Sequence, residues 1–367
     1  MIVAPLPSIA SLPIYRAGRS AEVVERETGI ANASRLASNE SPYGPLPSVR
    51  ETLAETSDTI NRYPAVRAEQ LISEIASSFD VPRESVIAGP GSAGLLWQLA
   101  GAYLGPGRSI VAPTPSFEGY PLIARLSGAS LIQVPLRDHA VHVPDMVEAI
   151  EDDTAVVVIA EPNNPTGTGI GADAIEALVD ATRERSLLVI DEAYVEFTSN
   201  PSRSIEMAIA NDHVVVLRTF SKAFGLASLR IGFAIGHPDV VGYIDRVGPP
   251  FSVTTHAEAA AIASLRAISE LQQRVEAIVS ERQRVISAVR AAGIDCLDSD
   301  TNFAFLPISD SAEPLAAELE RLGVITRPVA GVGLRVTIGS VEDNDRFLGA
   351  IAFTQAHHPK QSGASQL

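Results

Sequence analysis

The sequence predicts an α/β protein with a mostly parallel central sheet in a large domain, followed by a smaller α+β domain. From about residue 84 to 236, short runs rich in β-branched residues alternate with longer helix-like stretches. Several of these runs are apolar at every position, which is typical of strands covered on both faces in a parallel sheet. After about residue 257 the pattern changes to a long helical stretch and a few short strands, which favours a second, smaller unit.

The predicted strands of the large domain follow one another along the chain, with helix-like stretches between them. They cover 85–88, 109–112, 130–134, 155–160, 187–190, 214–217 and 231–235. In the smaller domain, a long helix is predicted over 257–292 and a second helix reaches Leu322. The strands predicted there cover 302–306, 324–326 and 334–338.

The chain length of 367 residues is sufficient for two domains. The proline-rich N-terminal segment predicts an arm that packs on the small domain or on a partner subunit, and the polar C-terminal segment predicts disorder. We therefore expect an arm at 1–35, a large cofactor-binding domain at 36–255, a small domain at 256–355 and a disordered tail at 356–367.

The composition excludes several classes of function. The balance of 28 basic and 44 acidic residues gives a net charge of −16, and nucleic acids and anionic membranes select basic surfaces. Cys296 is the single cysteine, so no intramolecular disulfide is possible, which fits a reducing compartment. Neither a signal peptide nor an apolar stretch of about 18 residues is found. We expect a cytoplasmic protein without a bound metal.

Lys222 is the most informative residue of the sequence. It follows the apolar run 214–217, and Thr219, Ser221 and Arg230 flank it. Hydroxyls and an arginine suit an anionic phosphate, and a partly desolvated lysine has a lowered pKa and becomes a nucleophilic amine. The combination predicts a lysine that forms a Schiff base with a phosphorylated aldehyde cofactor, pyridoxal 5'-phosphate (PLP).

Further candidates directly follow other predicted strands, where ligands bind in open α/β sheets. The glycine-rich segment 89–94 opens a helix whose free N–H groups can hold a phosphate. The later strands are followed by aromatic, amide and carboxylate side chains. In chain order, the candidates are Gly91, Ser92, Ala93, Phe117, Asn164, Asp191 and Tyr194.

The phosphate and the ring of such a cofactor each have predicted partners. Ser92, Ser221 and Arg230 would bind the phosphate. Phe117 would stack on the ring face, and an ionised Asp191 would hold a proton on the pyridine nitrogen.

The remaining candidates would act on the reacting end of the cofactor. Asn164 and Tyr194 would hydrogen-bond its phenolic oxygen. Lys222, once released by the substrate, would carry the proton between substrate and cofactor carbons. We therefore predict Lys222, Asp191 and Tyr194 as the catalytic residues.

Each candidate alone also has an ordinary structural interpretation. Asp191 fits a helix N-cap, and Asn164-Pro-Thr-Gly fits a turn. Phe117 and Tyr194 fit core positions, and Arg230 fits a surface ion pair. Their occurrence at successive predicted strand ends, in the order that one site requires, favours the functional interpretation.

A nicotinamide-dependent oxidoreductase is the alternative from a different class. Gly89-x-Gly91-x-x-Gly94 matches the dinucleotide-binding fingerprint, because it follows a strand and opens a helix. The fingerprint also needs an acidic residue at the end of the next strand, which here ends Ala112-Pro-Thr-Pro115. A phosphate-binding helix start explains the glycines equally well.

Five motifs support a more specific interpretation: Ala37-Ser-Asn-Glu-Ser-Pro-Tyr-Gly-Pro45, Asn61-Arg-Tyr-Pro64, Pro162-Asn-Asn-Pro-Thr-Gly167, Asp191-Glu-Ala-Tyr194 and Ser221-Lys-Ala-Phe-Gly225. Together they resemble fold-type I PLP enzymes, and specifically the histidinol-phosphate aminotransferase branch, from about residue 9 to 350. The resemblance implies a homodimer in which Tyr63 reaches the cofactor phosphate of the partner subunit. Tyr63 could otherwise simply anchor a loop.

Within that branch, the sequence is similar to actinobacterial aromatic amino acid (phenylalanine) aminotransferases. Histidinol-phosphate enzymes usually carry a longer loop between the arginines that correspond to Arg327 and Arg335. The resemblance makes Arg335 the candidate for binding the substrate α-carboxylate, because its planar fork allows bidentate pairing. Asn39 is a further substrate-binding candidate, and Arg327 would bind the phosphate of histidinol phosphate if that were the substrate.

The resemblance thus implies an aminotransferase that acts on phenylalanine, tyrosine and tryptophan with a 2-oxo acid such as 2-oxoglutarate. Histidinol-phosphate transamination in histidine biosynthesis and a PLP decarboxylase of the same fold are the alternatives. Three positions depart from the family pattern. Ser228 replaces a glycine, Ala65 replaces an acidic residue, and Val329 stands where the aromatic group often has tyrosine. Val329 and Ala65 bear on the substrate.

Overall fold

A computed structural model of the chain describes residues 3–5, 7–10, 12 and 19–357. The tail was expected to begin at residue 356, but residues 356 and 357 still belong to the last helix, α14 (Val341–His357). The rest of the expected tail, from residue 358 onward, lies outside the described residues.

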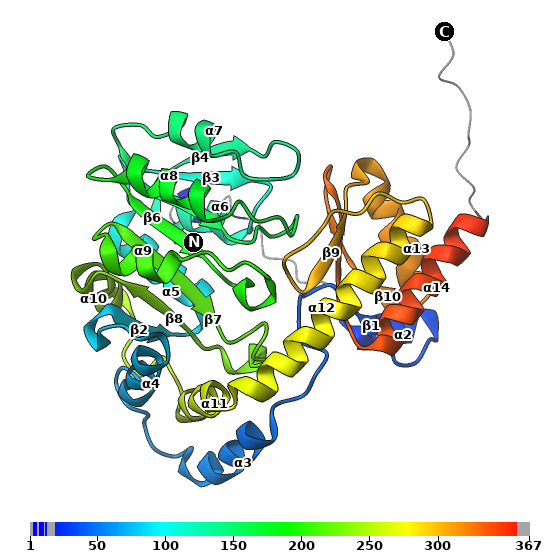
Figure 1. Cartoon of the computed structure of the whole chain (residues 1–367), viewed down its shortest axis with the longest axis horizontal. Coiled ribbons are helices and arrows are strands. Elements are labelled where there is room, and N and C mark those ends of the chain that lie inside the picture. The colour runs from blue at the N-terminus through cyan, green and yellow to red at the C-terminus, as the bar shows by residue number, and fades with distance from the viewer. Residues whose placement is uncertain (1–2, 6, 11, 13–18, 358–367) are drawn as a thin grey trace.

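A seven-stranded sheet forms the centre of the larger part of the molecule (Figure 1), in the order β2-β8-β7-β6-β5-β3-β4. Neighbouring strands from β7 to β4 are parallel, whereas β8 is antiparallel to both of its neighbours. The mostly parallel sheet is therefore confirmed. The strands are β2 (Val86–Gly89), β3 (Ser109–Thr114), β4 (Ser130–Pro135), β5 (Thr154–Ala160), β6 (Leu187–Asp191), β7 (Val214–Thr219) and β8 (Gly232–Gly236).

Helices cover both faces of this sheet. Successive side chains of a strand point to opposite faces, so Val156 and Val158 pack on one layer of helices while Val157 and Ile159 pack on the other. This explains why the strands are apolar at every position. The first layer contains α5 (Gly91–Tyr103), α6 (Gly119–Ser127) and α10 (Pro238–Val247), and the second contains α7 (Val143–Glu148), α8 (Ala172–Thr182) and α9 (Ser204–Ala210).

The smaller part of the molecule is built on an antiparallel sheet with the order β11-β12-β9. Leu334, Val336 and Phe347 contribute to its core together with the long helix α12. Its elements are α12 (Ile268–Ala291), β9 (Phe303–Leu306), α13 (Ala312–Arg321), β10 (Val324–Ile325), β11 (Arg327–Val329), β12 (Gly333–Thr337) and α14.

The single long helix expected over 257–292 is two helices. Helix α11 (Thr255–Arg266) packs with α3 (Pro47–Thr56) and α4 (Glu69–Phe79), whereas α12 runs from the larger part to the smaller one (Figure 1). The break lies at Ala267, whose backbone has φ −100° and ψ 34°. Alanine favours helix, so the sequence contains no stop signal there, and tertiary packing overrides the local propensity.

The N-terminal segment joins the smaller part to the site. Helix α2 (Ala21–Thr28) contacts α13, and β1 (Ser34–Arg35) pairs in parallel with β10. The described part of the expected arm thus packs on the smaller unit, apart from the short helix α1 (Pro7–Ala10), which contacts α6. The chain then passes between the two parts as a strap without helix or strand, residues 36–41 (Figure 1). In the described part of the chain, no helix is both long and apolar enough to span a membrane.

Candidate active site

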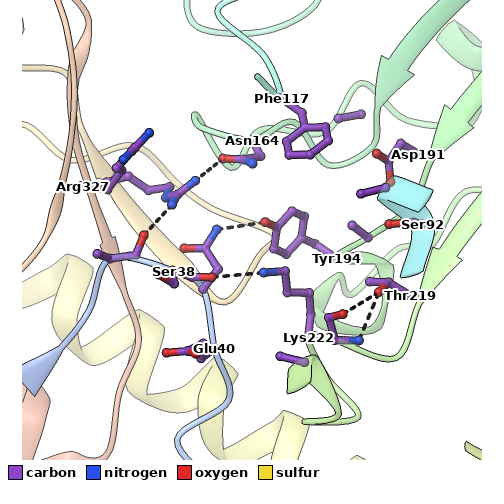
Figure 2. Close-up of a pocket in the computed structure, with 18 of the residues that line it drawn as sticks. Ser38, Glu40, Ser92, Phe117, Asn164, Asp191, Tyr194, Thr219, Lys222 and Arg327 are labelled. Atoms are coloured by element: carbon purple, nitrogen blue, oxygen red, sulfur yellow. Dashed lines mark hydrogen bonds between the residues drawn. The ribbon is translucent and has the colours of Figure 1, made fainter. Parts of the chain in front are cut away.

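A cavity of about 300 Å³ opens at the carboxyl ends of β5, β6 and β7, where the strap crosses the sheet edge (Figure 2). Nearly all of the residues that the sequence predicted for the site line it. The predicted residues that line it are Asn39, Ser92, Ala93, Phe117, Asn164, Asp191, Tyr194, Thr219, Ser221, Lys222, Arg230, Arg327 and Arg335.

Hydroxyls and an arginine converge at one end of the cavity. Thr219 Oγ1 donates to Ser221 Oγ over 3.0 Å, and Arg230 Nη1 donates to Ser221 Oγ over 3.2 Å. Ser92 and Ala93, in the first turn of α5, line the same cavity, and free N–H groups at a helix start favour an anion. This end is therefore suited to a phosphate.

Two glycines let the backbone approach closely at this end. Gly91 has φ +82°, and a Cβ there would lie 2.6 Å from Arg230 Nη2. A Cβ on Gly232 would lie 2.6 Å from the backbone nitrogen of Ser92. Sequence reasoning singled out Gly91 but missed Gly232, because it lies on β8 and meets α5 only in the folded chain.

Asp191 ends β6 at the floor of the cavity and is 6% exposed. Its Oδ2 accepts a hydrogen bond from Tyr120 Oη over 3.3 Å, while Oδ1 has no hydrogen-bond partner among the described residues. Burial raises the pKa of Asp191 to about 6, and the Tyr120 hydrogen bond offsets part of that rise. A buried carboxylate oxygen without a partner is costly, so it suits a cationic N–H of a ligand.

Lys222 lies beside the strap. Its Nζ donates to the carbonyl oxygen of Ser38 over 3.2 Å and lies 5.8 Å from the centre of the Tyr194 ring (Figure 2). Burial and, secondarily, the positive charge of Arg335 lower the pKa of Lys222 to about 8. About a tenth of the amine is therefore uncharged at pH 7, far more than for an ordinary lysine, and the uncharged form is the nucleophile.

Asn39 holds Tyr194 rather than pointing freely into the cavity. Its Nδ2 donates to Tyr194 Oη over 2.9 Å, and its Oδ1 accepts from Thr337 Oγ1 over 3.0 Å. Asn39 is 1% exposed and has φ +54°, in the left-handed region that asparagine tolerates. This geometry gives Asn39 a role in positioning Tyr194, while its predicted contact with substrate stays a prediction because Asn39 also lines the cavity.

Arg335 bridges the larger part of the molecule and the strap. Its Nη1 donates to Asn164 Oδ1 over 2.5 Å, and its Nη2 donates to the carbonyl oxygen of Ala37 over 2.6 Å. The guanidinium fork therefore lies at the cavity wall next to Asn164, where a substrate carboxylate can reach it.

Two predicted site residues do not line the cavity: Gly91, which adjoins its phosphate end beside Arg230, and Tyr63. The side chain of Tyr63 is 84% exposed, and its ring contacts Phe251 with 4.9 Å between centroids. Conversely, the cavity contains residues that the sequence did not suggest, because they act through the backbone or lie on the strap. The polar ones are Ser38 and Glu40, and the others are Ala37, Ala160, Ala193 and Ala227. Tyr120 is added as the partner of Asp191.

These features fit pyridoxal 5'-phosphate. The phosphate would bind at Ser92, Thr219, Ser221 and Arg230, where glycines leave room, and the ring nitrogen would meet the free Oδ1 of Asp191. When bound, the cofactor supplies an aldehyde that condenses with amines and an electron-poor ring that takes up negative charge.

A family model described as aminotransferase class I and II matches residues 32–351. The chain belongs to this family. Its aminotransferases depend on PLP, so the predicted enzyme class, cofactor and fold type are confirmed. Sequence reasoning found them because the residues around the cofactor follow the strands in chain order.

Named relatives of this aminotransferase are similar over nearly the whole chain. The aromatic amino acid aminotransferase of Thermobifida fusca is 43% identical over 93% of this chain and 94% of its own length. That of Streptomyces avermitilis is 42% identical over the same shares. The structure of histidinol-phosphate aminotransferase from Sinorhizobium meliloti with pyridoxal-5'-phosphate has a TM-score of 0.88 and 27% identity, covering 97% of this chain and 99% of that one.

Proposed function

We propose that this aminotransferase transfers the amino group of aromatic L-amino acids (phenylalanine, tyrosine and tryptophan) to a 2-oxo acid such as 2-oxoglutarate. The observation that carries the proposal is the 43% identity, over 93% of the chain, to a relative named as an aromatic amino acid aminotransferase. A mainly apolar groove next to the cavity, lined by Phe117, Leu122 and Val329 among others, supports an aromatic side chain.

The residues of the site would share the work as follows. Arg335 binds the α-carboxylate of the substrate and so fixes its orientation. Lys222 Nζ, with its lowered pKa, takes up and returns the proton at the substrate α-carbon. Asp191 holds the proton on the ring nitrogen, while Asn39 fixes the hydroxyl of Tyr194.

Histidinol phosphate is the second candidate substrate. Arg327 lines the cavity and supplies a positive charge for a phosphate, and the solved structure from Sinorhizobium meliloti is named as a histidinol-phosphate aminotransferase.

The decarboxylase alternative has weaker support, because L-threonine-O-3-phosphate decarboxylase from Porphyromonas gingivalis is 21% identical and shares the fold alone.

We also propose a homodimer in which Tyr63 contributes to the site of the partner subunit. Tyr63 is 84% exposed although its ring is apolar, and Ile60, Val66 and Phe251 nearby in the chain or in space are exposed as well. Covering such apolar surface favours association. The single cysteine further favours a reducing compartment such as the cytoplasm.

The deciding measurement compares kcat/KM for phenylalanine and for histidinol phosphate, with 2-oxoglutarate as acceptor. We expect phenylalanine to be the better substrate, with tyrosine and tryptophan close to it. A higher kcat/KM for histidinol phosphate would reject the aromatic assignment and leave the aminotransferase class intact.

A further inference from the structure

Arg327 and Arg335 place two positive charges at one end of the cavity. Arg327 begins β11 and is the direct cross-strand partner of Arg335 on the antiparallel strand β12. Directly opposed side chains lie on the same face of a sheet, and like charges there repel. Each arginine therefore needs a compensating acceptor or anion.

Arg335 donates to two neutral acceptors, Asn164 Oδ1 and the carbonyl oxygen of Ala37, whereas Arg327 pairs with a carboxylate. Arg327 Nη2 donates to Oε1 and Oε2 of Glu118 over 2.8 and 3.1 Å. Glu118 directly precedes helix α6 and follows Phe117, which lines the cavity. The ion pair thus joins the larger part of the molecule to the smaller one at the mouth of the site.

The pair lies at the junction between the cavity and a second hollow. A groove of about 710 Å³ shares Phe117 and Arg327 with the cavity and is lined mainly by apolar side chains, including Leu122 and Val329. A substrate side chain that extends past Arg327 into this groove therefore meets apolar surface and the Glu118 carboxylate, which lines the groove as well.

We propose that Glu118 is a specificity-determining residue, which neutralises Arg327 and so disfavours substrates whose side chain ends in an anion. This inference rests on the proposed aromatic specificity and deepens it. An anion at Arg327 must displace Glu118 or lie beside a like charge, and the cost grows with the charge. A phosphate monoester carries about −1.5 to −2 at neutral pH, a carboxylate −1, and a phenyl ring no charge.

The exposure of the two side chains sets the size of the effect. Glu118 is 61% exposed and Arg327 is 22% exposed. Charges at such a rim are partly screened by water and salt, so the effect is a preference rather than an absolute barrier. It also leaves room for a dicarboxylic acceptor to use Arg327 at moderate cost.

The test is the Glu118→Gln variant of the holoenzyme, which keeps the shape of the side chain and removes its charge. We expect kcat/KM to rise about 3- to 10-fold for histidinol phosphate, less for glutamate, and least for phenylalanine. The gain should appear mainly in KM and shrink at 0.5 M KCl. Glu148→Gln, which removes an exposed carboxylate on α7, controls for net charge and should leave all three values unchanged.

Arg327→Ala supplies the second variant. In that background Glu118→Gln should raise kcat/KM for histidinol phosphate less than it does in the unmodified enzyme, because only the direct repulsion between Glu118 and the phosphate is left to remove. An equal rise for all three substrates, or no rise for histidinol phosphate, would overturn the proposal. The proposed function is tested separately on the unmodified enzyme. Should that enzyme fail to use phenylalanine, the ratio of histidinol phosphate to glutamate still decides the role of Glu118.

Discussion

Arg327 and Arg335 are direct cross-strand partners on β11 and β12, and each donates hydrogen bonds to a different set of acceptors. Arg335 donates to Asn164 and to the strap carbonyl of Ala37, whereas Arg327 donates to Glu118. The site thus has one end around Asp191, where we propose that the cofactor ring binds, and an arginine end, where we propose that anionic groups of the substrate bind. Both ends depend on residues far apart in the sequence.

Lys222 can be tested by covalent labelling, because the chain contains only one other lysine, Lys360. Borohydride reduction of the yellow holoenzyme should attach the cofactor to the Lys222 peptide alone, as mass spectrometry would detect. Lys222→Ala should lower kcat by at least about 10²- to 10⁴-fold, since it removes the group that moves the proton. Lys360→Arg is the matched control and should keep colour and rate; label at Lys360 would refute the assignment.

Asp191 should destabilise the cofactor-free protein at neutral pH. Its pKa is raised by burial from 3.8 to about 6, so its contribution to stability is most favourable below pH 4 and is lost as the pH rises through 6. Asp191→Asn should therefore raise the free energy of unfolding by about 3 kcal/mol at pH 7.5, and most of the gain should vanish near pH 4. Urea unfolding of both proteins across this range measures it.

Asp145 serves as a control, because its pKa is shifted down whereas that of Asp191 is shifted up. Burial acts to raise its pKa, but hydrogen bonds from His142 and Arg137 outweigh burial and hold that pKa below its ordinary value. Asp145→Asn should therefore lower the free energy of unfolding at pH 7.5, but only slightly, because the Arg137–Asp145 pair lies at the surface.

Asp191→Asn should also abolish most of the aminotransferase activity. A variant that is less stable than the unmodified protein at pH 7.5 would contradict the account of Asp191.

Arg230 should contribute strongly to cofactor affinity. It lines the cavity and donates to Ser221, and its backbone has φ +53°, an unusual conformation for arginine. A charged hydrogen bond to phosphate is worth roughly 1.5–3 kcal/mol, so Arg230→Ala should raise the Kd for pyridoxal 5'-phosphate about 10- to 100-fold. Absorbance titration measures this, with the exposed Arg183→Ala as control. Equal affinities in the two variants would exclude Arg230 from the phosphate site.

The cofactor end was predictable because its residues directly follow apolar strands. Asp191 ends β6, and Ser92 opens the helix after β2. Parallel strands bring such positions to one edge, so chain order alone gathers them. The mostly parallel sheet followed from the same uninterrupted apolar runs.

The substrate end was harder to predict, because it is assembled by long-range contacts. Glu118 and Arg327 are 209 residues apart, and no sequence motif links the two positions. Ser38 contributes a backbone carbonyl, which any residue type provides. Asn39 was expected to bind substrate, yet its amide is engaged by Tyr194 and Thr337. Only the crossing of the strap over the sheet edge reveals these roles.

Tyr63 provides a test of whether each site is shared between two subunits. It does not line the cavity of its own chain and is 84% exposed. Tyr63→Ala should therefore weaken cofactor binding and lower activity if the partner's site uses it. The variant alone does not distinguish a shared site from a damaged loop, because Tyr63 also contacts Phe251.

Mixed dimers make that distinction. A dimer of one Lys222→Ala chain and one Tyr63→Ala chain has one site with both residues intact if Tyr63 acts across the interface. Two differently tagged chains, unfolded and refolded together and purified on both tags, should then recover about half the activity of the unmodified dimer, since one of two sites is restored. If Tyr63 acted within its own chain, each site would lack one residue and the mixed dimer would stay as inactive as its parents. Recovery therefore requires both the dimer and the crossing of Tyr63.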